Sequence, residues 1–398
     1  MLSYTPTSVF LELERNDTAI TDIAETPNQA AVGAAVDALP NGNRLYDPFV
    51  LLQDADEARD ALDQLSGEAH ASVQGTIAQD AGRIRDVIGN RINGAFASVG
   101  TRGSVQVSTN GPGDGQPMIQ PGGTIWGEAY GSFGQVQGDG NSADLKRNSG
   151  GFIAGLESTG FYGYQAGIVA GYGRTEARVA DRNSDADLDN FTIGTYAGRA
   201  YGAVLTQLGA AYTYSAVNTK RQVAFTGFSD TLSADYSANT FQAFGELGYA
   251  IGTPAAMLEP FAGLAVVHVE TDSFNEKGGT AALHVNGSSQ TLGVSTLGLR
   301  AGYEYGVVNQ GTVLSFNGTL AWRHSYGDVT PEVSSAFVTD GTQAFTVAGT
   351  PIDEDTVLVE TGANLKITES LNLSASYRGE FGTNAQDNTL NARFGLTF

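Results

Sequence analysis

The last nine residues of the chain, 390–398, alternate between apolar and small or polar side chains. The apolar positions are Leu390, Ala392, Phe394, Leu396 and Phe398, and Asn, Arg, Gly and Thr lie between them. Because successive side chains of a strand point to opposite faces, this segment predicts a strand with one apolar and one hydrated face. An ending of this kind on an aromatic ring favours a barrel strand in a lipid bilayer over a strand of a soluble sandwich.

The composition is compatible with such a barrel and excludes several other classes. The sequence contains no run of 18 apolar residues, which excludes transmembrane helices, whereas a barrel strand needs only about ten alternating residues. A net charge of −22 argues against nucleic acid as a partner, and zero cysteines exclude disulfides and zinc–thiolate sites. Residues 1–4 lack the basic start and apolar run of a signal peptide, so we expect an exported chain to be a fragment of a longer one.

The first 122 residues divide into three predicted segments. Residues 1–53 contain a strand-like stretch at Ser8–Glu14 and a short helix near Asn28–Leu39. Residues 54–96 show three- and four-residue spacing of apolar side chains, which predicts a helix. Its apolar face includes Leu62, Leu65, Val73, Ile77, Ile84 and Ile88. Glycines at 67, 75, 82 and 89 weaken a helix, so we expect it to need a surrounding surface or to break into two pieces. Residues 97–122 are typical of a flexible connector.

From residue 123 to residue 398 the apolar period is two. We predict about twelve antiparallel strands, an even number as in bacterial single-chain barrels. The segments lie near 124–137, 149–159, 162–179, 188–201, 203–218, 241–251, 256–274, 297–305, 314–323, 355–367, 371–381 and 387–398. Aromatic residues near strand ends, such as Tyr172 and Trp322, are expected to form interfacial girdles. Residues 331–355 are either a long external loop or a strand extension.

Charged side chains recur in mid-strand on the face opposite the apolar one. They are Glu128, Glu157, Glu246, Arg300, Glu304, Arg323, Glu360, Lys366, Arg378, Glu380 and Arg393. If these residues were buried in a dry core, desolvation of each unpaired charge would cost about several kcal/mol. We therefore expect these residues to face a hydrated lumen. A soluble sheet with one face in bulk water is the alternative, but it leaves the apolar face of every strand unexplained.

Several local sequences resemble one protein family. Residues 62–72 (LDQLSGEAHAS) resemble a segment found just upstream of the barrel in autotransporters, which secrete by the type V route. Residues 126–131 (WGEAYG) resemble the first strand of their translocator (β) domain, and residues 4–11 and 28–32 resemble the end of a passenger and its junction. The terminal Phe398 matches the family as well.

This resemblance implies an all-β transmembrane barrel in the bacterial outer membrane, with an N-terminal helix threading its lumen. It implies export of an N-terminal passenger to the cell surface, anchoring of that passenger, and a pore plugged by residues 54–96. Residues 1–53 would be the end of the passenger and its junction. Phe398, Leu396 and Phe394, with Ala392, would form the signal read by the barrel-assembly machinery. Expected partners are outer-membrane lipid, the passenger, this machinery and periplasmic chaperones, and we expect a monomer.

Two other functions fit the same pattern. A diffusive porin would leave residues 54–96 outside the lumen, and a surface adhesin or enzyme fragment would carry its activity in residues 1–50. Some family members cut themselves at paired asparagines in the lumenal helix. This chain has only the separated Asn90 and Asn93, which argues against such cleavage.

We find no catalytic constellation and expect no enzyme activity, cofactor or metal in this chain. Ser66, His70 and Ser72 lie close in sequence, but no oriented carboxylate or nucleophile-elbow glycine pattern accompanies them. Residues 181–187 (DRNSDAD) resemble a calcium loop. Ala186 occupies the position that requires glycine, and Thr192 the position of the bidentate glutamate, so a solvated acidic turn is favoured.

Overall fold

The computed structural model describes residues 2–11, 18–98, 122–161, 163–253, 255–309, 312–339, 343–368 and 370–397. Phe398 and residues 99–121 of the predicted connector lie outside these ranges. Within them, no helix is both long enough and apolar enough to cross a membrane.

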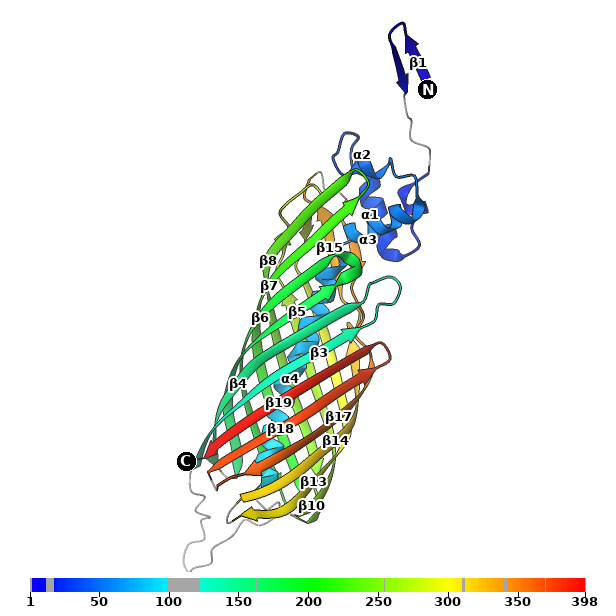
Figure 1. Cartoon of the computed structure of the whole chain (residues 1–398). Coiled ribbons are helices and arrows are strands. Elements are labelled where there is room, and N and C mark those ends of the chain that lie inside the picture. The colour runs from blue at the N-terminus through cyan, green and yellow to red at the C-terminus, as the bar shows by residue number, and fades with distance from the viewer. Residues whose placement is uncertain are drawn as a thin grey trace, which may run out of the picture.

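Twelve long antiparallel strands of the described chain form a closed barrel (Figure 1). They are β3 (Gly122–Val136), β4 (Leu145–Phe161), β5 (Tyr164–Val179), β6 (Ser184–Tyr201), β7 (Val204–Phe225), β8 (Phe228–Tyr249), β10 (Ala256–Thr271), β13 (Ser288–Asn309), β14 (Thr312–Gly327), β17 (Asp355–Lys366), β18 (Leu371–Gly382) and β19 (Ala385–Thr397). The short β9 (Ile251–Thr253) pairs with β10, which also pairs with β13. Pairing of β19 with β3 closes the barrel and confirms the predicted fold.

An aromatic row marks one edge of the apolar outer surface. Phe152, Tyr172, Phe191 and Tyr214 are register partners on β4 to β7, and each is at least 40% exposed. Aromatic side chains favour the headgroup level of a bilayer, so this row lies at one membrane boundary. On the bilayer side of the row, many exposed outward side chains are large and apolar, including Leu156, Ile168, Ile193, Leu208, Leu247 and Leu264.

Charged pairs replace apolar side chains on the outer surface beyond this row. Arg174 of β5 binds Asp187 of β6 at 2.9 Å, and Arg178 binds Asp185 at 2.6 Å. All four side chains are more than half exposed. Because arginine on the lipid face of a barrel is destabilising, these pairs lie in water outside the bilayer.

The barrel strands extend well beyond the bilayer at this end. Strands β7 and β8 have 22 residues each. At about 3.4 Å per residue, each strand is about 75 Å long. A strand needs only roughly 9–11 residues to cross a membrane, so about half of each strand lies outside the bilayer. The inward side chains of the β7 extension include Val217 and Val223, which are 1% and 0% exposed. The extension therefore has an apolar core of its own.

Helices occupy residues 20–98. They are η1 (Ile20–Asp22), α1 (Pro27–Asp37), α2 (Tyr46–Phe49), α3 (Ala55–Leu65) and α4 (Glu68–Ser98). Thr26 caps α1 by accepting a hydrogen bond from the Gln29 backbone, and Asp54 caps α3 in the same way from Asp56. The predicted helix over 54–96 is thus two helices. Gly67 has φ +65° at the break, and a side chain there would collide with Leu283.

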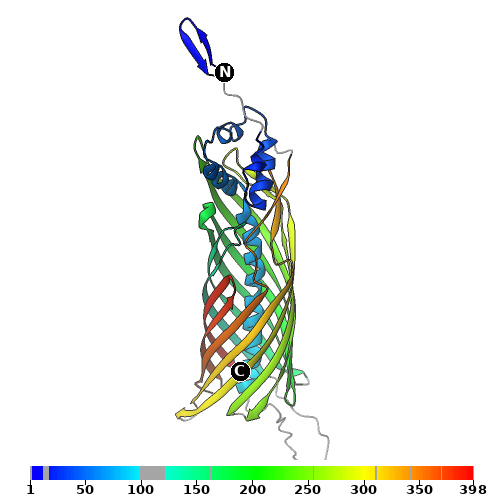
Figure 2. The ribbon, with the colours of Figure 1, turned by 90° about the vertical axis from the view of Figure 1, so that its right-hand side faces the viewer.

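Residues 18–65, which we call the cap, pack on the barrel extension (Figure 2). A small sheet joins them, formed by β11 (Phe274–Asn275), β12 (Leu283–Val285), β15 (Glu332–Phe337) and β16 (Phe345–Ala348). The shared core includes Val32, Val36, Leu45, Leu62, Leu65, Leu232, Leu283 and Val347, all nearly fully buried. Much of the predicted junction 1–53 is therefore folded onto the barrel, and residues 331–355 contribute two short strands.

Two short strands precede the cap. β1 (Leu2–Thr5) and β2 (Ser8–Leu11) pair antiparallel as a hairpin. The predicted strand at Ser8–Glu14 begins at the expected residue, and its last three residues lie outside the described ranges.

Candidate functional site

The lumenal helix α4 runs through the barrel from the cap to the opposite end (Figures 1 and 2). Its 31 residues give a length of about 46 Å at 1.5 Å per residue. One side packs against the barrel wall in an apolar cluster that contains Ile84, Val87, Ile88, Ile92, Trp126, Ile153, Val169 and Leu205. Glycine-rich α4 thus gains from the wall the stabilisation that its own sequence lacks.

An ion pair fixes α4 to the wall near its C-terminal end. Arg91 donates from Nε to Glu157 Oε2 at 3.0 Å, and its Nη2 contacts the other carboxylate oxygen. Glu157 also accepts hydrogen bonds from Tyr196 at 2.9 Å and Gln165 at 2.7 Å. The indole of Trp126 donates to the Tyr196 hydroxyl at 2.8 Å. This buried carboxylate is therefore fully partnered, as burial of a charge requires.

A second contact between α4 and the wall involves Asp86, about one and a half helical turns before Arg91. Asp86 accepts from Arg323 of β14 at 3.1 Å and from Arg378 of β18 at 2.6 Å. Glu380 of β18 binds Arg323 at 2.8 Å. Each charge in this cluster has a partner of opposite sign, and the cluster joins the helix to two strands.

Both asparagines of α4 bind wall side chains. Asn90 donates to Glu360 at 2.8 Å, and Asn93 accepts from Gln207 at 3.1 Å. Gln207 also donates to Glu246 at 2.6 Å. The two asparagines thus help to hold the helix in place.

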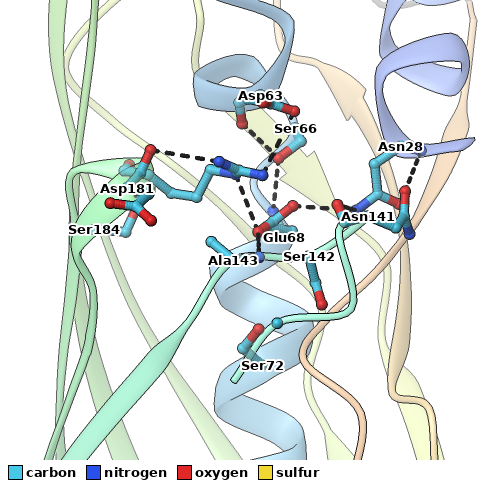
Figure 3. Close-up of polar contacts among 12 residues, drawn as sticks. Asn28, Asp63, Ser66, Glu68, Ser72, Asn141, Ser142, Ala143, Asp181 and Ser184 are labelled. Carbon is cyan, nitrogen blue, oxygen red and sulfur yellow. Dashed lines mark hydrogen bonds and ion pairs between the residues drawn. The ribbon is translucent and has the colours of Figure 1, made fainter. Parts of the chain in front are cut away.

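A polar cluster fixes the first turn of α4 below the cap (Figure 3). One oxygen of Glu68 accepts from the Ala143 backbone at 2.8 Å and contacts Arg182 Nε at 3.1 Å. The other oxygen accepts from Asn28 of α1 at 3.1 Å. Arg182 also reaches Asp63 of α3 at 3.5 Å. Burial raises the pKa of the Asp63 carboxyl, against the lowering effect of Arg182.

Asn28 joins the cap to two further segments. Its side chain donates to the Ala348 carbonyl at 2.8 Å and accepts from the Ala348 amide at 2.9 Å. Its backbone N–H donates to Asn141 at 2.8 Å. Because Asn28 is 2% exposed and well partnered, it fixes α1 to β16 and to the β3–β4 turn.

A buried triad lies beside this cluster. His70 of α4 binds Glu276 at 2.9 Å, and Arg221 of β7 binds the same carboxylate at 3.0 Å and 2.6 Å. Arg221 also donates to the Gln64 carbonyl of α3 at 2.6 Å. Burial alone would raise the pKa of Glu276, but Arg221 and His70 outweigh burial and hold that pKa well below its ordinary value.

A further pair spans the strands that close the barrel. Arg393 of β19 and Glu128 of β3 are register partners, and Arg393 Nε donates to Glu128 at 2.6 Å. Glu128 is 1% exposed. The pair therefore reinforces the joint between the first and last strands from within the lumen.

The structure places most of the sequence-predicted lumenal residues in such contacts. Those with a hydrogen-bonded or ionic partner in the lumen are Glu128, Glu157, Glu246, Arg300, Arg323, Glu360, Arg378, Glu380 and Arg393. Glu304 and Lys366 follow Arg300 and Glu360 on the same strand faces. Neither forms an ion pair with a described residue, and Glu304 is exposed.

The remaining predicted positions that the structure describes lie in three places. Val73, Ile77, Ile84 and Ile88 are buried on α4, as expected for a pore helix. Leu62 and Leu65 are not in the lumen but in α3, within the cap core. The break at Gly67 separates them from α4. Leu390, Phe394 and Leu396 point outward at 60%, 41% and 46% exposure.

The residues considered for hydrolysis or metal binding have separate partners. Ser66 Oγ donates to the Asp63 carbonyl at 2.7 Å, His70 binds Glu276, and Ser72 binds Thr350 at 3.1 Å. Residues 180–183 form a tight turn in which Asn183 has φ +46°. Among the residues that the structure describes, no group of three or more His, Cys, Asp or Glu is placed to hold a metal ion.

Sequence reasoning missed Arg182, Arg221 and Glu276. Arg182 lies inside the predicted acidic turn, and Glu276 lies in a connection between strands, so neither carried a strand or helix pattern. The alternation of strand β7 does place Arg221 inward, beside Val223 and Thr219, and this signal could have identified it.

Comparisons with known proteins agree with this architecture. Residues 125–378 match the family model described as "Autotransporter beta-domain". Two Serratia marcescens proteins, each named "Extracellular serine protease", are 32% and 30% identical to the chain over 358 and 357 residues. Each alignment covers 90% of this chain and 32% of the relative, so the chain spans about a third of their length.

Two solved structures share the fold. The translocator domain of the autotransporter NalP from Neisseria meningitidis has a TM-score of 0.57 at 14% identity, covering 81% of this chain and 99% of that one. The β domain of the Bordetella autotransporter BrkA has a TM-score of 0.51 at 17% identity, covering 69% and 99%. The chain belongs to the autotransporter β-domain family and is an outer-membrane translocator.

Proposed function

We propose that α4 and the cap close the pore once the passenger has passed through it. In this proposal α4 tethers the passenger and plugs the lumen, and the cap covers the mouth at the cell surface. The observation that carries it is the set of contacts between α4 and the wall. Asp86, Asn90 and Arg91 bind side chains of different strands around the lumen.

The cap supports a second part of the proposal, which is that closure follows export. Its apolar residues pack against the extensions of β7 and β8 and the small sheet, and not against one another alone. Glu57 of α3 accepts two hydrogen bonds from Thr226 in the β7–β8 turn. We therefore propose that residues 18–65 fold only outside the cell, on a preformed barrel.

The passenger is proposed to be a serine protease. The two curated relatives carry that name, and the chain covers only 32% of each of them. An activity-based fluorophosphonate probe applied to the full-length protein should label only the sequence upstream of this chain. Labelling of residues 1–398 alone would instead support an enzyme within this fragment.

Assembly partners complete the proposal. The alternating outward residues Leu390, Phe394 and Leu396 lie on the strand that closes the barrel, and with Phe398 they resemble the family's assembly signal. We propose that barrel-assembly machinery reads this strand after delivery by periplasmic chaperones.

Surface labelling tests the export role against the porin alternative. An epitope tag ahead of residue 1, with a secretion signal, should bind antibody on intact Gram-negative cells. The same tag inserted at Gly202, in the β6–β7 turn at the end opposite the cap, is the matched control and should bind only after the outer membrane is opened. An N-terminal tag that stays hidden in intact cells would favour the porin.

A further inference from the structure

The lumenal helix α4 fills only part of the barrel. Its apolar side packs against strands β3 to β7, and three cavities of about 120, 60 and 120 Å³ lie along its polar side. Asn90 lines all three cavities. Together their linings extend from Ala78 to Asn93, about 22 Å of helix at 1.5 Å per residue. Charged and amide side chains line these cavities, so water fills them.

The cavities end at different segments at the two ends of the barrel. Away from the cap, the third cavity reaches Asn364 and Ser374, which lie near the connection between β17 and β18. At the cap end, the first cavity is bounded by Ile352 and Asp353, which belong to the connection between β16 and β17. We call residues 349–353 of this connection the strap. The strap therefore covers the hydrated side of α4 at the cap end.

The strap is buried, which is unusual for a connection between strands. Thr350 is 3% exposed, Ile352 is 8% exposed, and Gly349 is buried as well. Loops ordinarily run over the surface, because buried backbone groups need hydrogen-bond partners. Here the Gly349 N–H donates to the Pro331 carbonyl and the Ile352 N–H donates to the Val329 carbonyl, both at 2.8 Å. The inward position of the strap is thus supported by hydrogen bonds within the same connection.

One end of the strap lies directly on α4. A Cβ added at Gly349 would collide with the backbone of Ala71 and Ser72, so the two backbones are in close contact. The Thr350 N–H donates to Ser72 Oγ at 3.0 Å, and the Thr350 hydroxyl donates to the Ala143 carbonyl at 3.0 Å. The close approach of the strap to the helix therefore depends on glycine at position 349.

The other end of the strap is fixed to the barrel wall. Asp353 accepts hydrogen bonds from the backbone N–H of Asn384 at 2.9 Å and of Ala385 at 2.8 Å, where β18 turns into β19. Between the two ends, Ile352 belongs to the same buried apolar cluster as Val73 of α4. The strap thus spans the gap between the helix and the wall, over the first cavity.

We infer that the strap is a lid that closes the hydrated side of the lumen at the cap end. The inference rests on the proposed plugging by α4 and adds a second closing element to it. Because the strap binds Ser72 of α4, it docks only when α4 is in the lumen, and a passenger in transit displaces it. Closure of the pore therefore takes two parts, the helix on the apolar side of the lumen and the strap on the polar side.

Single-channel conductance of the full 1–398 chain tests the lid directly. In G349V the added side chain pushes the strap off the Ser72 backbone, while the ion pairs of α4 stay in place. We expect severalfold larger conductance steps than in the native protein. The matched control is G131V, because Gly131 lies on an outward face with nothing within 4 Å of an added Cβ. Heat-modifiable migration in gels shows whether each variant has folded.

The result separates this inference from the proposed function. If α4 did not plug the lumen, the native chain itself would conduct freely. If only the lid were wrong, folded G349V would stay as closed as the native protein, and that result would overturn the inference.

Hydrogen exchange measured by mass spectrometry tests the strap with a smaller change. S72A removes the hydroxyl that binds Thr350, so the amides of residues 349–353 should exchange severalfold faster than in the native protein. The matched control is T76A, because the Thr76 hydroxyl donates to the Ser72 carbonyl within α4. Fast exchange of the strap in the native protein would overturn the inference, as would equal exchange in native protein and S72A.

Discussion

Arg91 of the lumenal helix and Glu157 of strand β4 form a bidentate ion pair inside the barrel. The Nε–Oε2 distance is 3.0 Å, and the two residues are 7% and 6% exposed. Pairs of this geometry combine charge with directional hydrogen bonds. The pair therefore fixes the position of α4 along β4 of the barrel wall.

Replacing Arg91 by Gln should loosen the plug. Breaking a buried pair by removing one partner lowers the free energy of unfolding by about 3–5 kcal/mol. Denaturant titration in detergent checks this, with Trp126 as the fluorescent reporter because it bonds Tyr196, which bonds Glu157. The double variant R91Q/E157Q should recover part of the loss, since no charge is left unpaired. R59Q, in the cap, is the control, and equal stability of R91Q and native protein would refute the prediction.

The joint between the first and last strands should depend on Arg393. R393Q leaves Glu128 buried without its partner, so we expect the barrel to lose its heat-resistant gel migration at a lower temperature. The expected loss is about 3 kcal/mol or more, as for other buried pairs. K366Q is the matched control, because Lys366 forms no ion pair with a described residue. A similar shift in both variants would contradict the assigned role of Arg393.

Arginine substitutions should distinguish the two faces of the wall. Leu299 points outward and is 41% exposed, so L299R should destabilise the barrel by about 2–4 kcal/mol if it meets the bilayer midplane. S315R places the same side chain on the inward face and should be milder. Gly298, which also lies on the inward face, is no suitable comparison, because a side chain there would collide with Phe261 and Ala321. Equal effects of L299R and S315R, measured by urea titration in lipid vesicles, would contradict this assignment of the two faces.

The docking of the cap should weaken in acid through Glu276. The pKa of Glu276 is held below its ordinary value of 4.5, because Arg221 and His70 outweigh the effect of burial. A lowered carboxyl pKa means that the stabilisation is complete above about pH 4.5 and is lost as pH falls toward the folded-state pKa.

Limited proteolysis of residues 18–65 across this pH range measures that loss. E276Q should be cleaved faster than native protein at neutral pH, and it should lose the acid-dependent step that Glu276 contributes. D56N, an exposed carboxyl of α3, is the control. An unchanged acid profile in E276Q would exclude Glu276 as the group responsible.

The barrel follows directly from the alternation of side chains. The two-residue period alone correctly predicts that Leu299 points outward and Arg300 inward. It does so because one face of each strand meets lipid and the other meets the hydrated lumen. The lumenal helix follows from its three- and four-residue spacing. Both patterns depend only on residues that are close together in the sequence, so they can be recognised without an alignment or a structure.

The cap could not be predicted in the same way. Its core joins Leu45 and Leu62 to Leu232 and Leu283, which are far away in sequence. The strand extensions alternate with the same two-residue period as the membrane-spanning parts of the strands. The local sequence therefore does not show that the inward apolar residues of the extensions form a docking surface for the cap. The partners of Glu68 are likewise non-local, and Arg182 lies in a turn that the sequence indicates only as acidic and solvated.

Single-channel conductance in planar bilayers tests the central claim that α4 fills the lumen of a membrane-spanning barrel. The full chain should show small or rare conductance steps, because the helix and its ion pairs occupy the lumen. A chain lacking residues 1–96 should show large, stable steps, since the polar inner wall is then filled with water. Equal conductance of the two chains would contradict the account.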